Sequence, residues 1–174
     1  MTDAEADSLL SAYEATDQTS FGLLAEVRSD PAVVGAAARA LAAGASGDQR
    51  WAATYVWVNE GSDPAPLLAL LAVDDAAIRA MAATGLLARG RPEGFEPLIE
   101  LLVDDSLRPG QPPSEVWRDA VMALVRYTAI SELGPPFDAT TQQRAEAKER
   151  WQAWLDGNRD RLTFDEAESL WVVN

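Results

Sequence analysis

The segments PLLALL at residues 66–71 and PLIELL at residues 97–102 are nearly the same and start 31 residues apart. Each follows a stretch of helical periodicity that ends in glycine, at Gly61 and at Gly90. Repetition at this spacing in a helical pattern is typical of stacked helix pairs, because each pair buries its apolar face only against its neighbours. The repeat therefore predicts an all-α fold, in which helix pairs stack into an α-α superhelix, or solenoid, of about nine helices.

Start and stop signals place these helices along the chain. Asp30 and Pro31 predict a helix N-cap and first turn, and Gly44 a stop, so we expect a helix over 31–43. Asp48 is expected to cap the next helix, which ends at Gly61. We expect one domain over 1–174, with N-terminal cap helices (1–45), two clear repeats (46–104), an inserted loop (105–113), a third repeat (114–162) and a tail (163–174) that can pair as a short β-hairpin.

One repeat resembles a known family. The string IRAMAATGLLARG (78–90), followed by RPEGFEPLIELLVDD (91–105), is similar to the HEAT-like repeats of bacterial proteins, including those first noticed in phycobilisome lyases. The likeness covers more than half of the chain. It implies a right-handed superhelical stack, with the first helix of each pair outside and the second helices lining a concave face. It carries no catalytic signature.

The charge of the chain restricts its partners. There are 28 acidic and 14 basic residues, for a net charge of −14, and no segment is basic enough to form a phosphate-binding stripe. Binding of nucleic acids and of anionic lipid surfaces draws on cationic contacts, which such a field opposes. We therefore expect the partner to be another protein, basic or neutral, and expect neither nucleic acid nor membrane. The acidity is equally explained by solubility.

Two residue types are missing. The chain has no cysteine and no histidine, which removes disulfides, thiolate or imidazole metal sites and the common nucleophile–base pairs. A general acid or base would have to be a carboxylate, a lysine or a tyrosine. We therefore expect no cofactor and no metal, and the composition disfavours an enzyme without excluding one. The acidic first 25 residues lack the pattern of a secretion signal, and no apolar run reaches membrane-spanning length, so a cytoplasmic protein is expected.

Aromatic side chains are the first candidates for partner binding. Trp51 and Tyr55 are four residues apart and so share one helix face, and Trp57 lies on another. Aromatic residues dominate interface hot spots, because they remove much surface from water at low entropic cost. The alternative is core packing beside the alanine-rich helix over 31–43. Trp117, in the third copy of the first helix, is a further candidate.

Polar residues supply the other candidates. Arg108 lies in the inserted loop, whose prolines reduce the entropy lost on docking, although the loop can equally be a tolerated insertion. Glu96 and Glu100 give the PLIELL helix a polar side. Paired acids such as Asp104 and Asp105 lack the spacing of a calcium loop and are better explained as caps and turns.

The favoured function is a non-enzymatic module that binds another protein. One alternative is an acidic inhibitor or immunity-type protein, which would block a basic enzyme through complementary charge. The resemblance to HEAT-like repeats also leaves open a lyase, which would need a deep apolar cleft. DNA glycosylases of this repeat type use a basic groove, and the net charge of −14 argues against that activity.

Overall fold

A computed structural model describes residues 1–109 and 113–174. This part of the chain is mostly helical, with four short strands and two 3₁₀ turns. The elements are α1 (Asp3–Ser11), α2 (Gln18–Val27), α3 (Pro31–Ala42), α4 (Gly47–Glu60), α5 (Ala65–Leu70), α6 (Ala76–Leu87), η1 (Pro92–Gly94), α7 (Phe95–Leu101), β1 (Leu107–Arg108), β2 (Ser114–Glu115), α8 (Val116–Thr128), α9 (Thr141–Asn158), η2 (Arg159–Arg161), β3 (Leu162–Asp165) and β4 (Leu170–Val173).

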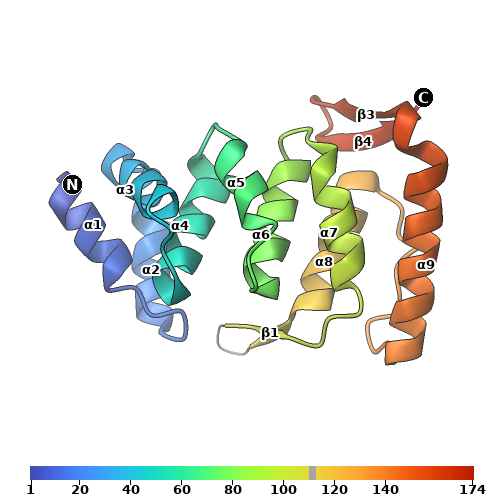
Figure 1. The fold of residues 1–174 in the computed structure, drawn as a ribbon, viewed down its shortest axis with the longest axis horizontal. Coiled ribbons are helices and arrows are strands. Elements are labelled where there is room, and N and C mark those ends of the chain that lie inside the picture. Colours follow the sequence, from blue (N-terminus) through green and yellow to red (C-terminus); the bar gives the residue numbers. More distant parts are fainter. Residues whose placement is uncertain (110–112) are drawn as a thin grey trace.

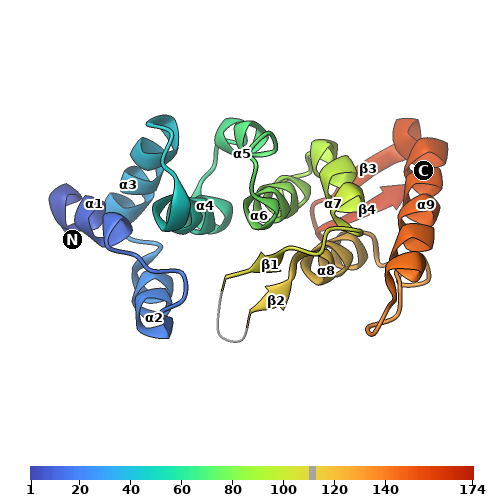
Figure 2. The same cartoon turned by 60° about the horizontal axis from the view of Figure 1, so that its bottom comes forward.

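The helices follow one another along the long axis of the molecule, from the N-terminus at one end to α9 and the C-terminal hairpin at the other (Figure 1). Figure 2 shows two rows, with α3, α5 and α7 in one and α4, α6 and α8 in the other. Within the second row α6 contacts both α4 and α8, and it also contacts α5 and α7 of the first row. The molecule is therefore built mainly from contacts between elements that are near in sequence.

The repeated segments occupy equivalent places. PLLALL forms most of α5, and PLIELL lies in α7. Leu67 and Leu98, the first leucine of each copy, are both fully buried, and each contributes about 1.5–3 kcal/mol to folding. The two segments are thus mainly packing elements, as their apolar composition indicates.

Local signals account for the helix boundaries, with one exception. The Asp30 carboxylate accepts a hydrogen bond from the backbone N–H of Ala32 at 2.9 Å, and Gly44 has a φ of +75°, so α3 begins and ends as predicted. The prediction that Asp48 caps α4 was wrong, because the N-cap is Ser46. Asp48 lies inside the first turn, where its carboxylate accepts from the N–H of Ala15 at 3.1 Å and holds the segment before α2.

Two hydrophobic clusters form the core, and α6 lies between them. Ala82 and Leu86 on one side of α6 belong to the cluster of the N-terminal helices, while Ala83 and Leu87 belong to the C-terminal cluster, which also holds Trp151. The small side chains of α6 let four helices approach it closely. This explains why α6 is apolar on nearly all sides instead of amphipathic.

The insertion and the tail both contain strands. Instead of a loop throughout 105–113, β1 pairs with β2 in antiparallel register, so backbone hydrogen bonds replace solvent at the base of the insertion. The part of the predicted loop at 110–112 lies outside the described residues. In the tail β3 and β4 form the expected hairpin, which begins at Leu162. Trp171 of β4 is buried against Phe95, with ring centroids 5.4 Å apart, so this hairpin covers the ends of α6 and α7.

Candidate functional site

A groove of about 750 Å³ lies on the face formed by α4, α6 and α8, and we call it the aromatic groove. In Figure 2 α2 and the β1–β2 hairpin project from this face on the same side of the molecule. The groove is lined by Phe21, Trp51, Tyr55, Val58, Ala77, Ala80, Met81, Thr84, Arg108, Asp119, Val121, Met122, Ala123, Val125 and Arg126.

Stacked rings form one wall of the aromatic groove. The rings of Tyr13 and Trp51 are parallel with centroids 5.4 Å apart, and the ring of Tyr55 is also stacked with that of Trp51, at 5.7 Å. Phe21 of α2 tilts against Tyr55 at 5.3 Å. The aromatic pairs contribute about 0.5–1.5 kcal/mol each beyond area burial, so this wall is preformed. Within residues 1–109 and 113–174 the Tyr13 hydroxyl and Trp51 Nε1 are buried without a hydrogen-bond partner.

Small residues of α6 form part of the floor, beside Met81, and exposed large side chains form the rim. Ala77 and Ala80 of α6 are 4% exposed and leave the centre of the groove low. Met122 of α8 is 68% exposed and Phe21 is 40% exposed, although both are large apolar side chains. Apolar surface that remains exposed beside a concave floor is typical of binding sites.

Charged side chains lie at the α8 side of the groove. Arg108 of β1 forms an ion pair with Asp119 of α8 at 2.9 Å and also donates to the Ser114 hydroxyl at 3.0 Å. Burial raises the pKa of the Asp119 carboxyl, and Arg108 opposes this shift. The Arg126 guanidinium lies 5.5 Å from the ring of Tyr127. The groove is therefore apolar along most of its length, with cations at this side.

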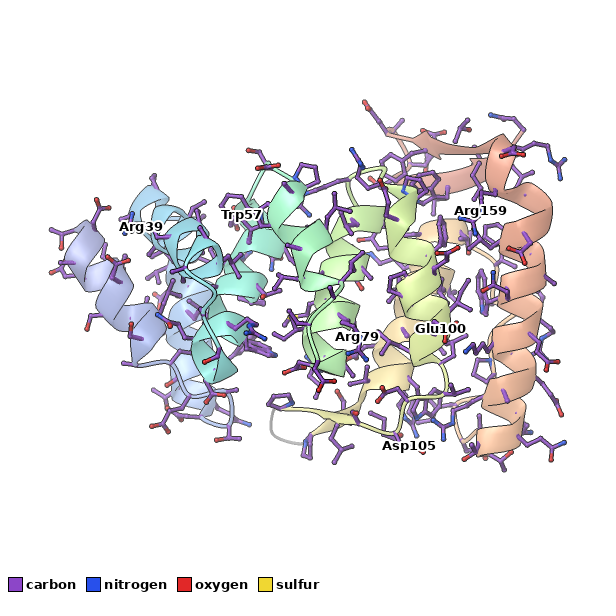
Figure 3. All side chains as sticks on the ribbon, viewed as in Figure 1. Arg39, Trp57, Arg79, Glu100, Asp105 and Arg159 are labelled. Atoms are coloured by element: carbon purple, nitrogen blue, oxygen red, sulfur yellow. The ribbon has the colours of Figure 1, made fainter. Side chains whose placement is uncertain are left out.

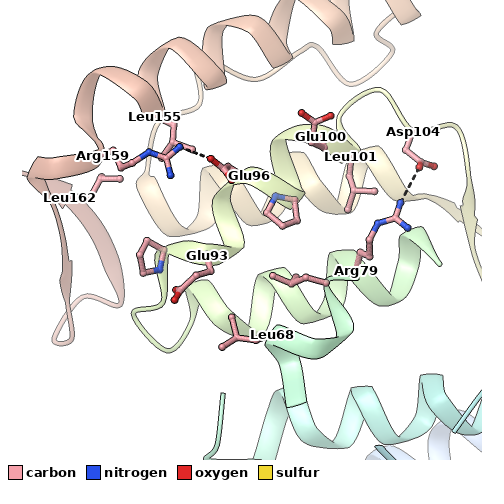
Figure 4. A pocket seen from close by; sticks show the side chains of 13 residues that line it. Leu68, Arg79, Glu93, Glu96, Glu100, Leu101, Asp104, Leu155, Arg159 and Leu162 are labelled. Atoms are coloured by element: carbon pink, nitrogen blue, oxygen red, sulfur yellow. Dashed lines mark hydrogen bonds and ion pairs between the residues drawn. The ribbon is translucent and has the colours of Figure 1, made fainter. Parts of the chain in front are cut away.

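A second groove, of about 940 Å³, lies over α7 between α5, α6 and α9, and we call it the acidic groove (Figure 4). Figure 3 places Arg79, Glu100 and Arg159 on this side of the molecule. The groove is lined by Leu68, Leu71, Arg79, Pro92, Glu93, Glu96, Pro97, Glu100, Leu101, Asp104, Leu155, Arg159 and Leu162.

Four carboxylates run along α7 and its flanks in the acidic groove, and each has a cationic partner. Glu96 pairs with Arg159 at 2.5 Å and Glu100 with Lys148 at 2.5 Å, so both pairs link α7 to the far side of the groove. Asp104 pairs with Arg79 at 3.7 Å and Glu93 with Arg91 at 2.6 Å, and the hydrogen bond from Arg91 lowers the pKa of Glu93. The acidic groove is thus largely neutralised within the protein.

The structure divides the six residues predicted to bind a partner among three places. Trp51, Tyr55 and Arg108 come together at the aromatic groove, although Arg108 is far from the other two in sequence. Trp51 is only 6% exposed and packs in the core, as the alternative interpretation expected, while Tyr55 is partly exposed. Glu96 and Glu100 lie in the acidic groove. Trp117 is only 3% exposed and packs beneath the guanidinium groups of Arg118 and Arg144, at 4.7 and 5.2 Å, so it reaches neither groove.

Most residues that line the groove were not predicted from the sequence, among them Phe21, Met122 and Arg126. Phe21 and Met122 belong to helices with ordinary apolar patterns, and no local signal separates an exposed apolar residue from a buried one. Arg126 follows Met122 by four residues, a spacing that indicates a shared helix face but not which surface that face forms.

Among residues 1–109 and 113–174 no group of three or more acidic side chains is placed to hold a metal ion. In the same part of the chain no helix has both the length and the apolar character needed to cross a bilayer. Comparisons with family models, with curated proteins and with solved structures find no match to this chain.

Proposed function

We propose that this chain is a non-enzymatic protein-binding module, and that the aromatic groove holds its partner. The observation that carries this proposal is the combination of a preformed aromatic wall, a low floor and an exposed rim in one open groove. Interface hot spots are rich in aromatic residues that are already held in place, because little side-chain entropy is then lost on binding.

We further propose that the helices form a HEAT-like solenoid. The contact pattern supports it, because first helices contact the next first helix (α4 with α6, α6 with α8), and second helices do so at α3–α5 and α7–α9, while α5 and α7 are joined mainly through α6. Such stacking produces continuous faces that extend over several repeats. The aromatic groove would then follow the face of the first helices, and the acidic groove that of the second helices.

The acidic groove raises a second candidate function, an inhibitor that captures a basic enzyme. A row of four carboxylates along one groove would attract a basic surface. However, each of the four already pairs with a cation of the same chain, so a basic partner would have to displace those contacts. We therefore favour the aromatic groove. Affinity for a captured partner that falls steeply between low and high salt would favour the inhibitor instead.

Two matched variants test the proposed function. Met122→Glu places a carboxylate on the rim of the aromatic groove. Phe137→Glu is the control, because it places a carboxylate at an exposed phenylalanine, 81% accessible, that does not line the groove. Both side chains are exposed, so both variants are expected to fold, which circular dichroism would check. A partner captured from native lysate by the wild type and by Phe137→Glu should be lost with Met122→Glu. Equal capture by all three proteins would refute binding through this groove.

A further inference from the structure

Arg126 differs from the other cations of this protein. Each of the other 13 lysine and arginine side chains donates to an oxygen, either in an ion pair or in a hydrogen bond to a carbonyl. Within residues 1–109 and 113–174 the Arg126 guanidinium has no such acceptor, and it lies over the ring of Tyr127, 5.5 Å from the centroid. Arg126 is an exposed residue, so water solvates its guanidinium in the protein alone and its donors can turn to an acceptor on a partner.

The position of Arg126 connects it to the aromatic groove. Arg126 and Met122 lie one helical turn apart on α8, and both line the groove. Of the charged residues in the lining, Arg108 and Asp119 neutralise each other at 2.9 Å, which leaves Arg126 as the unbalanced charge. The lining is therefore cationic by one charge, although the chain as a whole carries −14. A ligand that is apolar and bears one anionic group complements it.

The shape of the floor indicates a helix as the ligand. Ala77, Ala80 and Thr84 follow one another on α6 at intervals of three and four residues and line the groove between α4 and α8, with Met81 as the one larger α6 side chain beside them. Small residues in this arrangement let the axis of another helix approach to about 8–10 Å, with its side chains between those of the flanking helices. Large apolar residues on one face of that helix would then contact Tyr55 and Met122.

We propose that the aromatic groove binds an amphipathic helix of a partner protein that carries a glutamate or aspartate one turn from a large apolar residue, so that the apolar side chain contacts Met122 and the carboxylate pairs with Arg126. This inference rests on the proposed function, because it names the partner of the same groove. Binding of a helix through residues at intervals of three and four is an established mode of peptide recognition. The carboxylate fixes the direction and register of the helix, since a pairing displaced by one turn leaves Arg126 without its acceptor.

Selection from a display library of helical 16-residue peptides, with random residues on one face, tests this inference with the full chain as bait. Peptides are selected on the wild type and separately on Arg126→Glu, and their affinities are measured by fluorescence anisotropy. Arg150→Glu is the matched control, because it makes the same charge change at an arginine whose hydrogen bond, to Gly134 O at 3.4 Å, is long and lies outside the groove.

Peptides selected on the wild type should carry Asp or Glu one turn from a large apolar residue. They should bind Arg126→Glu at least about tenfold more weakly and Arg150→Glu equally well. Selection on Arg126→Glu should shift this position to Lys or Arg.

Two results would overturn the inference in different ways. If the selected peptides no longer bind Met122→Glu, but show no preference for acidic residues and bind Arg126→Glu as well as the wild type, the groove binds proteins but the acidic residue of the helix plays no part. Peptides that bind Met122→Glu and the wild type equally would remove the proposed function as well. Self-association that Met122→Glu abolishes, measured by light scattering, would identify a second copy of this chain as the occupant and also overturn the inference.

Discussion

Replacing Arg89 with methionine should destabilise the protein by about 2–4 kcal/mol, because Arg89 joins the ends of two helices. Arg89 lies two residues after the end of α6, and its Nη2 donates to the carbonyl oxygens of Trp57 and Val58, both at 3.0 Å, and of Gly61 at 2.6 Å. Val58 and Gly61 lie at the C-terminal end of α4, where backbone carbonyls lack intrahelical partners. The Trp57 carbonyl also accepts from the N–H of Gly61, at 2.9 Å. A cation there also complements the negative end of the helix dipole.

The magnitude follows from the number of hydrogen bonds. One nitrogen has two N–H bonds, so the three carbonyls of α4 share two donors. Hydrogen bonds of a charged group contribute about 1.5–3 kcal/mol each, which gives about 3–6 kcal/mol for two. Water recovers part of this loss because Arg89 is half-buried, and methionine keeps most of the apolar contact of the side chain.

Urea unfolding followed by tryptophan fluorescence and by circular dichroism measures the effect. Arg150→Met is the matched control, since it removes the same charge but only a 3.4 Å hydrogen bond, and it should change stability by less than about 0.5 kcal/mol. For a chain of this size Arg89→Met should lower the melting temperature by about 5–15 °C. If the two variants are equally stable, Arg89 does not hold α4 to α6 and the reasoning is wrong.

Three further predictions concern the core and its edges. Gly94→Ala would place a Cβ atom 2.3 Å from a backbone carbonyl oxygen of α6 and should cost more than about 2 kcal/mol in thermal unfolding, whereas Gly157→Ala, with open space around it in α9, should stabilise by up to about 1 kcal/mol. Burial raises the pKa of Tyr13 from 10.0 to about 12, so the folded protein holds the phenol proton more tightly than the unfolded chain does. The unfolding free energy therefore does not depend on this proton below pH 10 and falls as the pH rises from 10 towards 12. Tyr13→Phe should therefore flatten the alkaline loss of stability in urea unfolding at pH 7 to 12. Asp105→Ala removes the ion-pair partner of Arg144, which is 5% exposed, and should lower the unfolding free energy by about 1–3 kcal/mol in urea.

Helix positions could be predicted because their signals are local. The proline at position 31, the glycine at position 44 and the apolar periodicity act within one or two turns, and the helices begin and end close to the expected residues. The prediction failed at Asp48, because the N–H of Ala15 competes with the N–H groups of the α4 N-terminus for its carboxylate. A residue 33 positions away decides that choice, and no local pattern contains it.

The candidate site was predicted only in part, for the same reason. The spacing of Trp51 and Tyr55 indicated a shared face, and the structure stacks their rings. The spacing did not show that Arg108 would reach the same groove, because that depends on how the β1–β2 hairpin packs against α8. Tryptophan is common in interface hot spots, but Trp117 is buried, because it lies on the side of α8 that packs against the neighbouring elements.

By itself the sequence determined the helical period, the repeated PLLALL and PLIELL helices, the C-terminal hairpin and the acidic charge. These follow from backbone preferences and side-chain patterns that operate over short distances along the chain. The tertiary structure alone decided that the carboxylates of α7 meet cations of the same chain, and that Arg126 meets none in the described residues. Such pairings depend on the relative orientation of helices distant in sequence, which is set by the packing of their buried faces.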